Sequence, residues 1–304
     1  MARVQQRAEA TAESLDAVVV GAGFAGLYML HRLRGLGLRV RVFETGSGVG
    51  GTWYWNRYPG ARCDIESMEY SYQFSEELQQ GWEWTERYAT QPEILRYINH
   101  VADRFDLRRD IQFETRVTDA VYDQASNRWM VATDKGEHLS ARFCIMAIGC
   151  LSTPRRPNFE GLESFRGDWY HTGYWPHDGV DFGGKRVGVI GTGSSAIQAI
   201  PIIARQAAQL TVFQRTANFS IPAWDGPLDA ATVRDQKSRY PEIRAKARAS
   251  IAGDIYDSHE KSALEVSPEE RRREFERRWK DGAFNFQATF PDLLTSEAAN
   301  DLAA

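Results

Sequence analysis

The chain has 304 residues, enough for about two globular domains, and its composition is that of an ordinary globular protein. Hydrophobic residues make up 42% and charged residues 26%, which argues against collagen-like, wholly disordered and membrane-embedded classes. The 37 basic and 41 acidic residues give a formal net charge of −4, so the chain offers no basic field for a nucleic acid.

The first 16 residues are polar and predict a flexible leader without the apolar core of a signal peptide. The best apolar run, 17–30, is short and broken by glycines, so we expect neither export nor a membrane span. Three cysteines without a C-x-x-C spacing favour a reducing compartment, and the six histidines show no metal-ligand spacing. These features predict a cytoplasmic protein without a metal site, and nothing indicates an obligatory protein partner.

The chain then passes through a strand, a glycine turn, a helix and a second strand, which together predict a βαβ unit. A strand at 17–20 ends directly at GAGFAG, leucines at helical spacing predict a helix over 24–36, and 40–43 is the next strand. Residues 45–90 are rich in glycine, aromatic side chains and charge, and we expect them to form loops.

A helix and several short strands follow. Apolar residues at helical spacing after Pro92 predict an amphipathic helix to about residue 105. Between 111 and 148 the runs IQFETRV, AVYD, RWMVAT and FCIMAIG have strand-like periodicity, and the turn residues between them predict a small antiparallel β-meander. Prolines and a glycine at 154–161 then mark a linker.

The strand, glycine turn and helix pattern occurs a second time from residue 186. The strand RVGVI ends at GTGSSA, a helix runs to residue 204, and 210–213 is the next strand. Beyond residue 219 the sequence is helical and charged, and EERRREFERRWK at 269–280 predicts a solvated amphipathic helix. The expected α/β organisation is therefore a first nucleotide-binding domain at 17–150, a linker at 151–182, the start of a second such domain at 183–222 and a helical segment at 223–304.

The first glycine turn has the dinucleotide fingerprint G-x-G-x-x-G, formed by Gly21, Gly23 and Gly26. Gly21 permits the tight turn, Gly23 lets the backbone approach a pyrophosphate, and Gly26 lets the helix pack closely. The helix N-terminus adds partial positive charge for the phosphates. Because Glu44 at the end of the next strand can accept hydrogen bonds from a ribose, we predict an FAD or NAD site rather than a merely structural turn.

The second glycine turn, Gly191, Gly193 and Ala196, has the related pattern G-x-G-x-x-A, but no acid follows the next strand. Arg215 and Thr216 stand there instead, and a guanidinium beside a hydroxyl binds a 2′-phosphate that a carboxylate would repel. This predicts NADP; the alternative for Arg215 is a surface cation without a ligand. Two dinucleotide sites in one chain indicate a flavoprotein reduced by NADPH.

A further motif lies between the fingerprints, at 165–176. Phe165, Gly167, His171 and Trp175 fit F-x-G-x-x-x-H-x-x-x-W-P, which resembles the fingerprint of the type I Baeyer–Villiger monooxygenases. The segment GGTWYWNRYPGARCDIESMEYSY at 50–72 resembles the flavin-proximal loop of this family, nearest to its phenylacetone and steroid monooxygenase branches. The match runs from about residue 15 to the end of the chain.

The resemblance implies two Rossmann-like domains, with the NADP domain inserted in the FAD domain, and a chain truncated on its C-terminal side. It implies FAD contacts in the first fingerprint, the flavin-proximal loop and the meander, namely Gly21, Gly23, Phe24, Ala25, Gly26, Glu44, Gly51, Thr52, Trp53, Asp64, Tyr70 and Val117. It implies NADP contacts in the loop and the second fingerprint, namely Arg62, Cys63, Asp64, Gly191, Thr192, Gly193, Ser194, Ser195, Ala196, Ile197, Gln198, Arg215 and Thr216.

The resemblance also implies roles beyond cofactor binding. The motif residues Phe165, Gly167, His171 and Trp175 would serve domain motion, although His171 by itself would be an ordinary hydrogen-bonded histidine. Asp64 would be catalytic by orienting an arginine that lies beyond the end of this chain. Without the resemblance, Asp64 is an ordinary surface ion-pairing residue.

The implied reaction is reduction of FAD by NADPH and reaction with O2 to a C4a-peroxyflavin, which inserts one oxygen atom beside a ketone carbonyl to give an ester or lactone. Aromatic or cyclic ketones are the expected substrates. Two alternatives stay open. One is oxygenation of an amine nitrogen or a sulfide sulfur, and the other is a non-catalytic nucleotide-binding fragment, because the catalytic arginine is absent from this chain.

Overall fold

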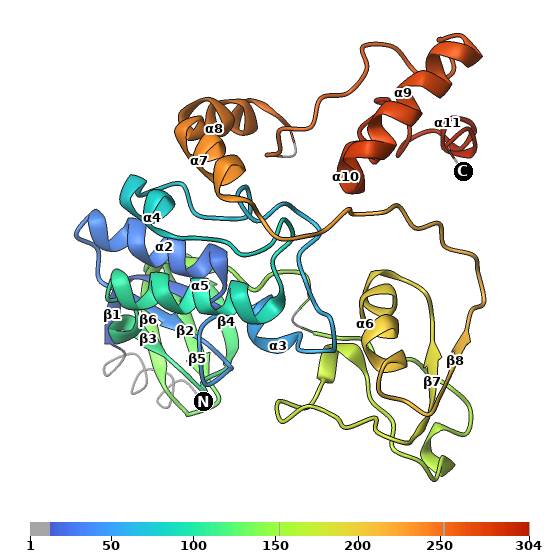
Figure 1. Cartoon of the computed structure of the whole chain (residues 1–304). Coiled ribbons are helices and arrows are strands. Elements are labelled where there is room, and N and C mark those ends of the chain that lie inside the picture. The colour runs from blue at the N-terminus through green and yellow to red at the C-terminus, as the bar shows by residue number, and fades with distance from the viewer. Residues whose placement is uncertain (1–12, 152, 252, 304) are drawn as a thin grey trace. The chain divides into compact units, whose positions relative to one another are not determined.

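The structure is a computed structural model that describes residues 13–151, 153–251 and 253–303. Its elements group into two compact units (Figure 1). The first unit comprises the described residues up to Pro59 together with Gln91–Asp181, and the second comprises Gly60–Thr90 and the residues from Phe182 onward. The chain therefore leaves the first unit, returns to it and leaves it again.

The first unit is built on a six-stranded sheet with the strand order β3-β2-β1-β6-β5-β4. Its strands are β1 (Glu13–Val20), β2 (Val40–Phe43), β3 (Ile111–Gln112), β4 (Val117–Asp123), β5 (Arg128–Thr133) and β6 (His138–Met146). Strands β3, β2, β1 and β6 run parallel, whereas β6, β5 and β4 form the antiparallel meander that the sequence predicts. The mixed α/β fold is confirmed.

The helices of the first unit are α2 (Phe24–Gly35), α3 (Thr52–Trp55) and α5 (Gln91–Arg104), with the 3₁₀ helices η1 (Arg108–Asp110), η2 (Leu162–Ser164) and η3 (Thr172–Tyr174). Helices α2 and α5 lie side by side (Figure 1), with the Phe24 and Tyr97 rings 6.2 Å apart. Strand β1 is central in the sheet, and its residues Ala17, Val18 and Val19 are fully buried. A continuous apolar run is typical of such a central parallel strand.

Several predicted boundaries in the first unit are wrong. Strand β1 begins at Glu13, because its pairing with β6 starts there, so residues 13–16 belong to the strand and not to the leader. Residues 1–12 of the predicted leader lie outside the described residues. The run at 111–117 is no continuous strand, because Glu114 adopts a left-handed conformation with φ +51° and β4 starts only at Val117.

Two further predictions need correction. The segment 45–90, expected to be loops, contains α3 and, in the second unit, α4 (Glu76–Gly81), whose first turn is capped by Ser75. The last strand of the meander starts at His138 rather than at residue 143, because it pairs with both β1 and β5. Short helices and strand extensions such as these depend on pairing and capping rather than on long periodicity.

The second unit contains a parallel pair, β7 (Arg186–Ile190) and β8 (Gln209–Phe213), connected by α6 (Ser194–Ala204). Its further helices, beside α4, are α7 (Ala230–Ser238), α8 (Tyr240–Ala249), α9 (Pro268–Asp281), α10 (Ala283–Gln287) and α11 (Glu297–Asp301). The second βαβ unit is therefore present as predicted. At the ends of its strands, Ile190 and Phe213 expose more than half of their surface.

The helix predicted at 269–280 is present as α9, but it is not solvated all round. The Phe275 ring packs against the rings of Phe286 and Phe290, both with centroids 5.4 Å away. Arg278, on the same helix, is buried. The charged run thus has one packed face, which its density of arginine and glutamate obscures in the sequence.

Segment 60–90 packs within the second unit, although the sequence assigned it to the first domain. The reason is a buried arginine on α8, Arg244, of which 4% is exposed. Its guanidinium donates to the carbonyl oxygens of Met68 at 2.8 Å and Glu69 at 3.0 Å, to Ser71 Oγ at 2.7 Å and to Gln79 Oε1 at 3.2 Å. One side chain from α8 therefore satisfies several polar groups of the segment.

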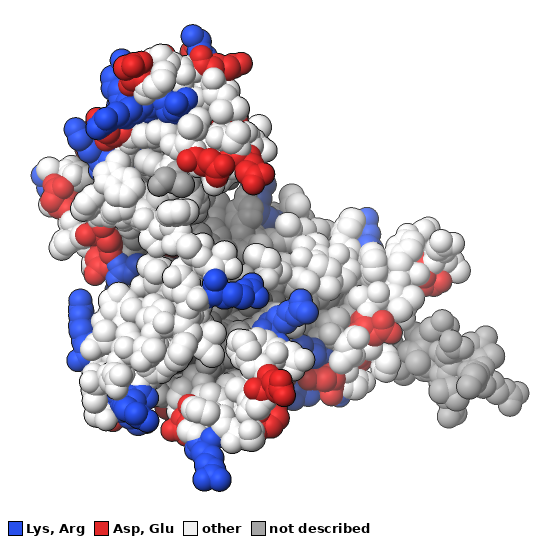
Figure 2. Space-filling view, turned by 90° about the vertical axis from the view of Figure 1, so that its right-hand side faces the viewer, with Lys and Arg blue, Asp and Glu red and all other residues white. Residues whose placement is uncertain are grey.

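On the face shown in Figure 2, basic and acidic residues are interspersed among uncharged ones, and this face carries no large patch of one charge. Within the described ranges, no helix is both long enough and apolar enough to cross a membrane. Among the residues that the structure describes, no group of three or more His, Cys, Asp or Glu side chains is placed to hold a metal ion.

We predict that Arg244→Met destabilises the chain by roughly 2–4 kcal/mol, because it removes four hydrogen bonds and leaves buried carbonyl groups unpaired. Urea denaturation followed by circular dichroism measures the change. Arg272→Met is the matched control, since Arg272 is exposed on α9 and, among the residues that the structure describes, pairs only with Glu276; it should change the stability by less than about 0.5 kcal/mol. Equal effects of the two substitutions would contradict the role of Arg244.

Candidate nucleotide-binding sites

The first fingerprint forms a tight turn between β1 and α2. Gly21 ends the strand with φ +103°. No side chain fits at Gly26, because a Cβ there would lie 1.8 Å from the carbonyl oxygen of Gly21. The third glycine of the motif therefore lets α2 pack directly on the turn, which is the reason that the sequence pattern requires it.

The N-terminus of α2 is open to a ligand. Among the described residues, no side chain caps it, whereas α7 and α9 are capped by Asp229 and Ser267. The backbone amides of Phe24, Ala25 and Gly26 lie in the first turn, where intrahelical acceptors are missing. Together with the helix dipole, these amides offer what a pyrophosphate needs.

Glu44 follows β2 and closes this turn from the side. Its carboxylate is buried, with 5% exposed, and accepts hydrogen bonds from the amides of Ala22 and Gly46, both at 2.7 Å. Each carboxylate oxygen has a second lone pair, so the group retains acceptor capacity for a ribose hydroxyl. Glu44 thus serves the turn itself as well as the predicted cofactor contact.

The loop that carries the next predicted FAD residues packs on the same turn. A Cβ added at Gly23 would lie 3.4 Å from the Cα of Gly51, which shows how closely the two backbones approach. Thr52 and Trp53 begin α3 directly afterwards, and the Trp53 side chain is buried. These residues therefore meet around the fingerprint although about 25 residues of sequence separate them.

Backbone pairing also brings Val117 to this turn. Thr115, two residues earlier, donates its amide to the carbonyl oxygen of Glu44 at 3.0 Å. The remaining predicted FAD residues, Asp64 and Tyr70, belong to the second unit. All other predicted FAD residues lie in the first unit.

The second fingerprint forms the corresponding turn between β7 and α6, and it is more open than the first. Gly191 has φ +102°, and a Cβ added at Gly191 or Gly193 would meet no atom within 4 Å. Thr192, between them, accepts a hydrogen bond at Oγ1 from Gln214 and one at its carbonyl oxygen from Asn218, both at 3.1 Å. No side chain of the described chain caps α6, so its first-turn amides face open space.

The residues of α6 that the resemblance assigns to NADP occupy the first turns of this helix. They are Ser194, Ser195, Ala196, Ile197 and Gln198. Arg215 and Thr216 follow β8 and are exposed, and Arg215 makes no ion pair with any residue that the structure describes. An unpaired guanidinium at this position is suited to a 2′-phosphate.

Tertiary structure brings the flavin-proximal loop to this second fingerprint. The amide of Arg62 donates to Gln198 Oε1 at 3.3 Å, and Gln198 Nε2 donates to Asp64 Oδ1 at 3.1 Å. The two sequence segments assigned to NADP, 62–64 and 192–198, therefore lie together. Sequence spacing alone gives no indication of this contact.

Arg62 is held by two carboxylates that the sequence analysis did not single out. Its guanidinium bonds to Asp225 and lies 3.4 Å from Glu86 Oε2. Asp225 Oδ1 also accepts the amide of Tyr88 at 3.1 Å. Because Asp225 is 163 positions from Arg62, no local pattern could have revealed the pair. In this structure, Arg62 anchors its own loop and is no free cation.

Burial controls the ionisation of the two other residues of this loop. It raises the pKa of the Cys63 thiol to about 12, so the thiol stays protonated at neutral pH and is no nucleophile. Asp64 is accessible to solvent, yet neighbouring protein atoms partly desolvate its carboxylate and raise its pKa, against the opposing effect of the hydrogen bond from Gln198.

The motif at 165–176 lies in the first unit and contacts mainly its own segment. His171 Nδ1 accepts the amide of Gly173 at 3.1 Å, at the start of η3. Trp175 is buried, and its ring centroid lies 5.6 Å from that of Tyr170. His171 is thus a hydrogen-bonded histidine, and Trp175 anchors the linker by its buried side chain.

The other two motif residues, Phe165 and Gly167, are exposed. Trp169, two residues after Gly167, is also exposed, and the guanidinium of Arg156 lies 4.7 Å from its ring centroid. The linker is thus tied to itself by stacking and local hydrogen bonds. The role of this motif in domain motion stays a prediction.

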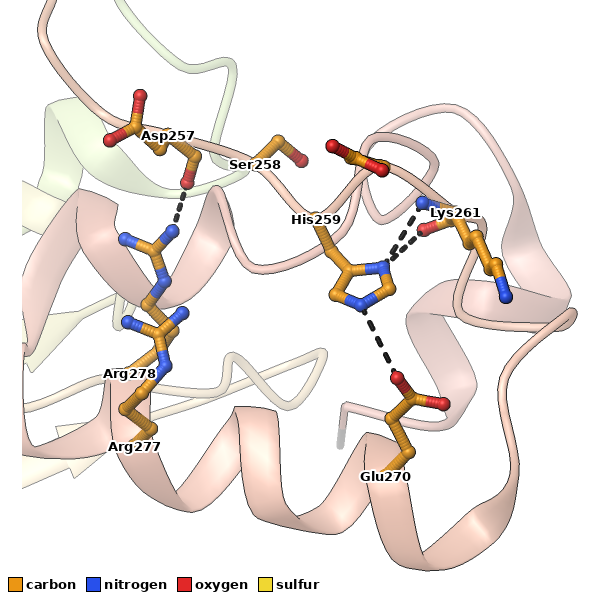
Figure 3. Close-up of a pocket in the computed structure, with 8 residues that line it drawn as sticks. Asp257, Ser258, His259, Lys261, Glu270, Arg277 and Arg278 are labelled. Atoms are coloured by element: carbon orange, nitrogen blue, oxygen red, sulfur yellow. Dashed lines mark hydrogen bonds and ion pairs between the residues drawn. The ribbon is translucent and has the colours of Figure 1, made fainter.

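A cavity of about 560 Å³ in the second unit is separate from all predicted cofactor residues. Figure 3 shows Glu270, Arg277 and Arg278 projecting from α9, and His259 on the facing segment with Nε2 3.6 Å from Glu270. The residues that line the cavity are Asp257, Ser258, His259, Glu260, Lys261, Glu270, Arg277 and Arg278. Acidic and basic groups balance there, so the cavity shows no preference for a charged ligand.

Two strand, glycine turn and helix units, each with an uncapped helix N-terminus, define an α/β protein with two Rossmann-like nucleotide-binding units. The chain belongs to the pyridine nucleotide-disulphide oxidoreductase family, whose model matches residues 18–239.

Curated relatives of this chain are monooxygenases, and one of them confirms the resemblance that the motifs predict. A Baeyer-Villiger monooxygenase of Pseudooceanicola batsensis is 47% identical over 292 residues, which cover 95% of this chain and 53% of the relative. The phenazine N-monooxygenase PhzNO1 of Lysobacter antibioticus is 46% identical, with coverage of 95% and 54%. The chain thus spans about half the length of the curated relatives that it matches.

Solved structures agree with the fold and with the predicted pair of cofactors. An oxidised steroid monooxygenase bound to NADP is 64% identical with a TM-score of 0.91, over 95% of this chain and 55% of that one. A complex of OTEMO with FAD and NADP is 40% identical with a TM-score of 0.90, over 96% and 56%. FAD and NADP, predicted here from Glu44 and Arg215, are the cofactors of that complex.

We predict that Gly26→Ala destabilises the chain by about 1–3 kcal/mol and abolishes FAD retention, because the new methyl group would collide with the Gly21 carbonyl. Denaturation curves and flavin absorbance after gel filtration measure the two effects. Gly35→Ala, at the other end of α2, is the matched control: a Cβ there meets no atom within 4 Å, so stability should be unchanged or rise by up to about 1 kcal/mol. Retention of FAD by both variants would contradict the prediction.

Proposed function

We propose that the complete gene product is an FAD-dependent, NADPH-consuming monooxygenase of the Baeyer–Villiger type. It inserts one oxygen atom of O2 beside the carbonyl group of a small-molecule ketone, aromatic or cyclic, to give an ester or lactone. We also propose the cytoplasm as its location, which the three free cysteines of the structure support.

The observation that carries the proposal is the contact between loop 60–64 and α6. It joins Asp64, assigned by resemblance to the flavin and its catalytic arginine, to the helix whose open N-terminus faces the predicted NADP site. Hydride transfer from a nicotinamide to a flavin requires the two rings to lie close together, and a loop with residues assigned to both cofactors would serve this requirement. The relatives named Baeyer-Villiger and N-monooxygenase support oxygen transfer as the reaction.

The residues of the first unit fit FAD. The close approach of Gly26 to Gly21 and the uncapped amides of α2 form a cradle for a pyrophosphate, and Glu44 adds the acceptor for a ribose. When bound, the flavin would accept a hydride from NADPH and supply the activation of O2.

The residues of the second unit fit NADP. Gly191 and Gly193 leave the space before α6 open, and Arg215 offers an unpaired guanidinium for the 2′-phosphate. The proposed role of Asp64 is to orient a cationic side chain with its partly desolvated carboxylate. In the family this side chain is an arginine from a later part of the sequence.

A second candidate function is oxygenation of an amine nitrogen, because a phenazine N-monooxygenase is nearly as similar to this chain as a Baeyer-Villiger monooxygenase. The two reactions share both cofactors and differ in the atom that receives oxygen. Trp175-Pro176 at the end of the linker motif favours the ketone reaction, since it completes the Baeyer–Villiger fingerprint.

We expect Arg215→Ala to weaken NADP+ binding about 10–100-fold and to leave NAD+ binding unchanged, because the two nucleotides differ only in the 2′-phosphate. Isothermal titration calorimetry measures both affinities. Arg205→Ala, an exposed arginine at the end of α6, is the matched control and should affect neither. If Arg215→Ala weakened both nucleotides equally, its assignment to the 2′-phosphate would be wrong.

Isotope labelling tests the reaction. The complete gene product, supplied with NADPH, a cyclic or aromatic ketone and ¹⁸O2, should form an ester or lactone that carries one ¹⁸O atom, detected by mass spectrometry. Incorporation of oxygen from labelled water would contradict a monooxygenase. A parallel incubation with phenazines, amines and sulfides separates the second candidate. For the 304-residue chain alone, NADPH oxidation in response to a ketone would contradict the alternative of a non-catalytic nucleotide-binding fragment.

A further inference from the structure

The side-chain amide of Gln198 makes three hydrogen bonds to the loop at 60–64. Its Oε1 accepts the Arg62 amide and its Nε2 donates to the Arg62 carbonyl oxygen, both at 3.3 Å. A side chain that pairs with both backbone groups of one residue holds that residue as a neighbouring strand would. The resemblance assigns Gln198 to NADP, but in the structure its amide faces the protein's own backbone.

The same amide reaches the Asp64 carboxylate. Nε2 donates to Asp64 Oδ1 at 3.1 Å, a bond to a charged acceptor and therefore stronger than a neutral one. This bond lowers the pKa of Asp64, in opposition to the partial desolvation that raises it. One side chain thus influences both the position and the ionisation of this carboxylate.

The loop approaches α6 so closely that only glycine fits at its start. A Cβ at Gly60 would lie 2.3 Å from the backbone carbonyl oxygen of Gln198, and Gly60 has φ +77°, in the left-handed region. Gln198 thus contacts the loop at three places: its backbone lies against Gly60, and its side chain bonds to Arg62 and Asp64. The loop therefore has little freedom to shift along the helix.

We infer that Gln198 is a positioning residue, which fixes Arg62 and Asp64 beside the nucleotide-binding end of α6. Because α6 is a helix that begins at the second fingerprint, Gln198 and the predicted phosphate-binding amides move as one body. Gln198 thereby couples the NADP site to the Asp64 carboxylate. The functional meaning of this coupling rests on the proposed function, whereas the positioning itself does not.

Hydrogen–deuterium exchange of the cofactor-free 304-residue chain tests the positioning. In Gln198→Leu, peptides that cover 60–66 should exchange about tenfold faster, because the amide of Arg62 loses its acceptor and the loop loses three bonds. Gln206→Leu, an exposed glutamine just beyond α6, is the matched control and should leave these peptides unchanged. Unchanged exchange in a folded Gln198→Leu would overturn the inference.

A second variant keeps the shape of the side chain. Gln198→Glu retains an acceptor for Arg62 but places a carboxylate against Asp64, so protection of the loop should be near wild type at pH 4 and fall several-fold by pH 8. If, after correction for intrinsic rates, the loop of Gln198→Glu exchanged as slowly as that of the unsubstituted chain at both pH values, the inference would also be contradicted. An NADP+ titration of the complete gene product is run in parallel: failure to bind would sink the proposed function, and the exchange result on the 304-residue chain would still decide the role of Gln198.

Discussion

The structure depends on hydrogen bonding of segment 60–90 by side chains that are distant in sequence. This segment interrupts the first unit in sequence and yet packs in the second, so its backbone polar groups need partners there. Gln198 on α6 and Arg244 on α8 provide them, one near each end of the stretch 62–71. These bonds hold the segment within the second unit, between the points where the chain passes from one unit to the other at 59–60 and at 90–91.

The same glycine motif is used in two different ways. In the first unit the turn is closed: α2 packs on Gly21, and the buried Glu44 carboxylate binds the turn amide of Ala22. In the second unit the turn is open, and an exposed guanidinium, Arg215, stands where the acid would be. A buried acceptor suits a ribose diol, whereas an exposed cation suits a phosphate. The burial of Glu44 therefore fits the FAD site predicted for the first unit, and the exposure of Arg215 fits the NADP site predicted for the second.

The two curated relatives show that the cofactor-binding part of such a chain is compatible with both candidate reactions. One is named for Baeyer–Villiger oxidation and the other for N-oxygenation of phenazine, and they share 47% and 46% identity with this chain over 95% of its length. Shared binding of the two cofactors accounts for such similarity, since cofactor chemistry is common to both reactions. The atom that accepts oxygen depends on the substrate pocket, whereas the two glycine fingerprints serve the cofactors.

The sequence by itself determined the two βαβ units, their glycine turns, the helices α2 and α5 and the family resemblance, because these depend on local periodicity and on residues close together in the chain. It misjudged 111–117, where a left-handed Glu114 ends a strand-like run, and it gave no sign that 60–90 packs in one compact unit with the residues from 182 onward. Only the tertiary structure decided that Gln198 binds Asp64 and that Asp225 binds Arg62, across 134 and 163 positions. Hydrogen bonds over such separations leave no periodic trace in a sequence, because any polar side chain on an exposed-looking helix or loop can make them.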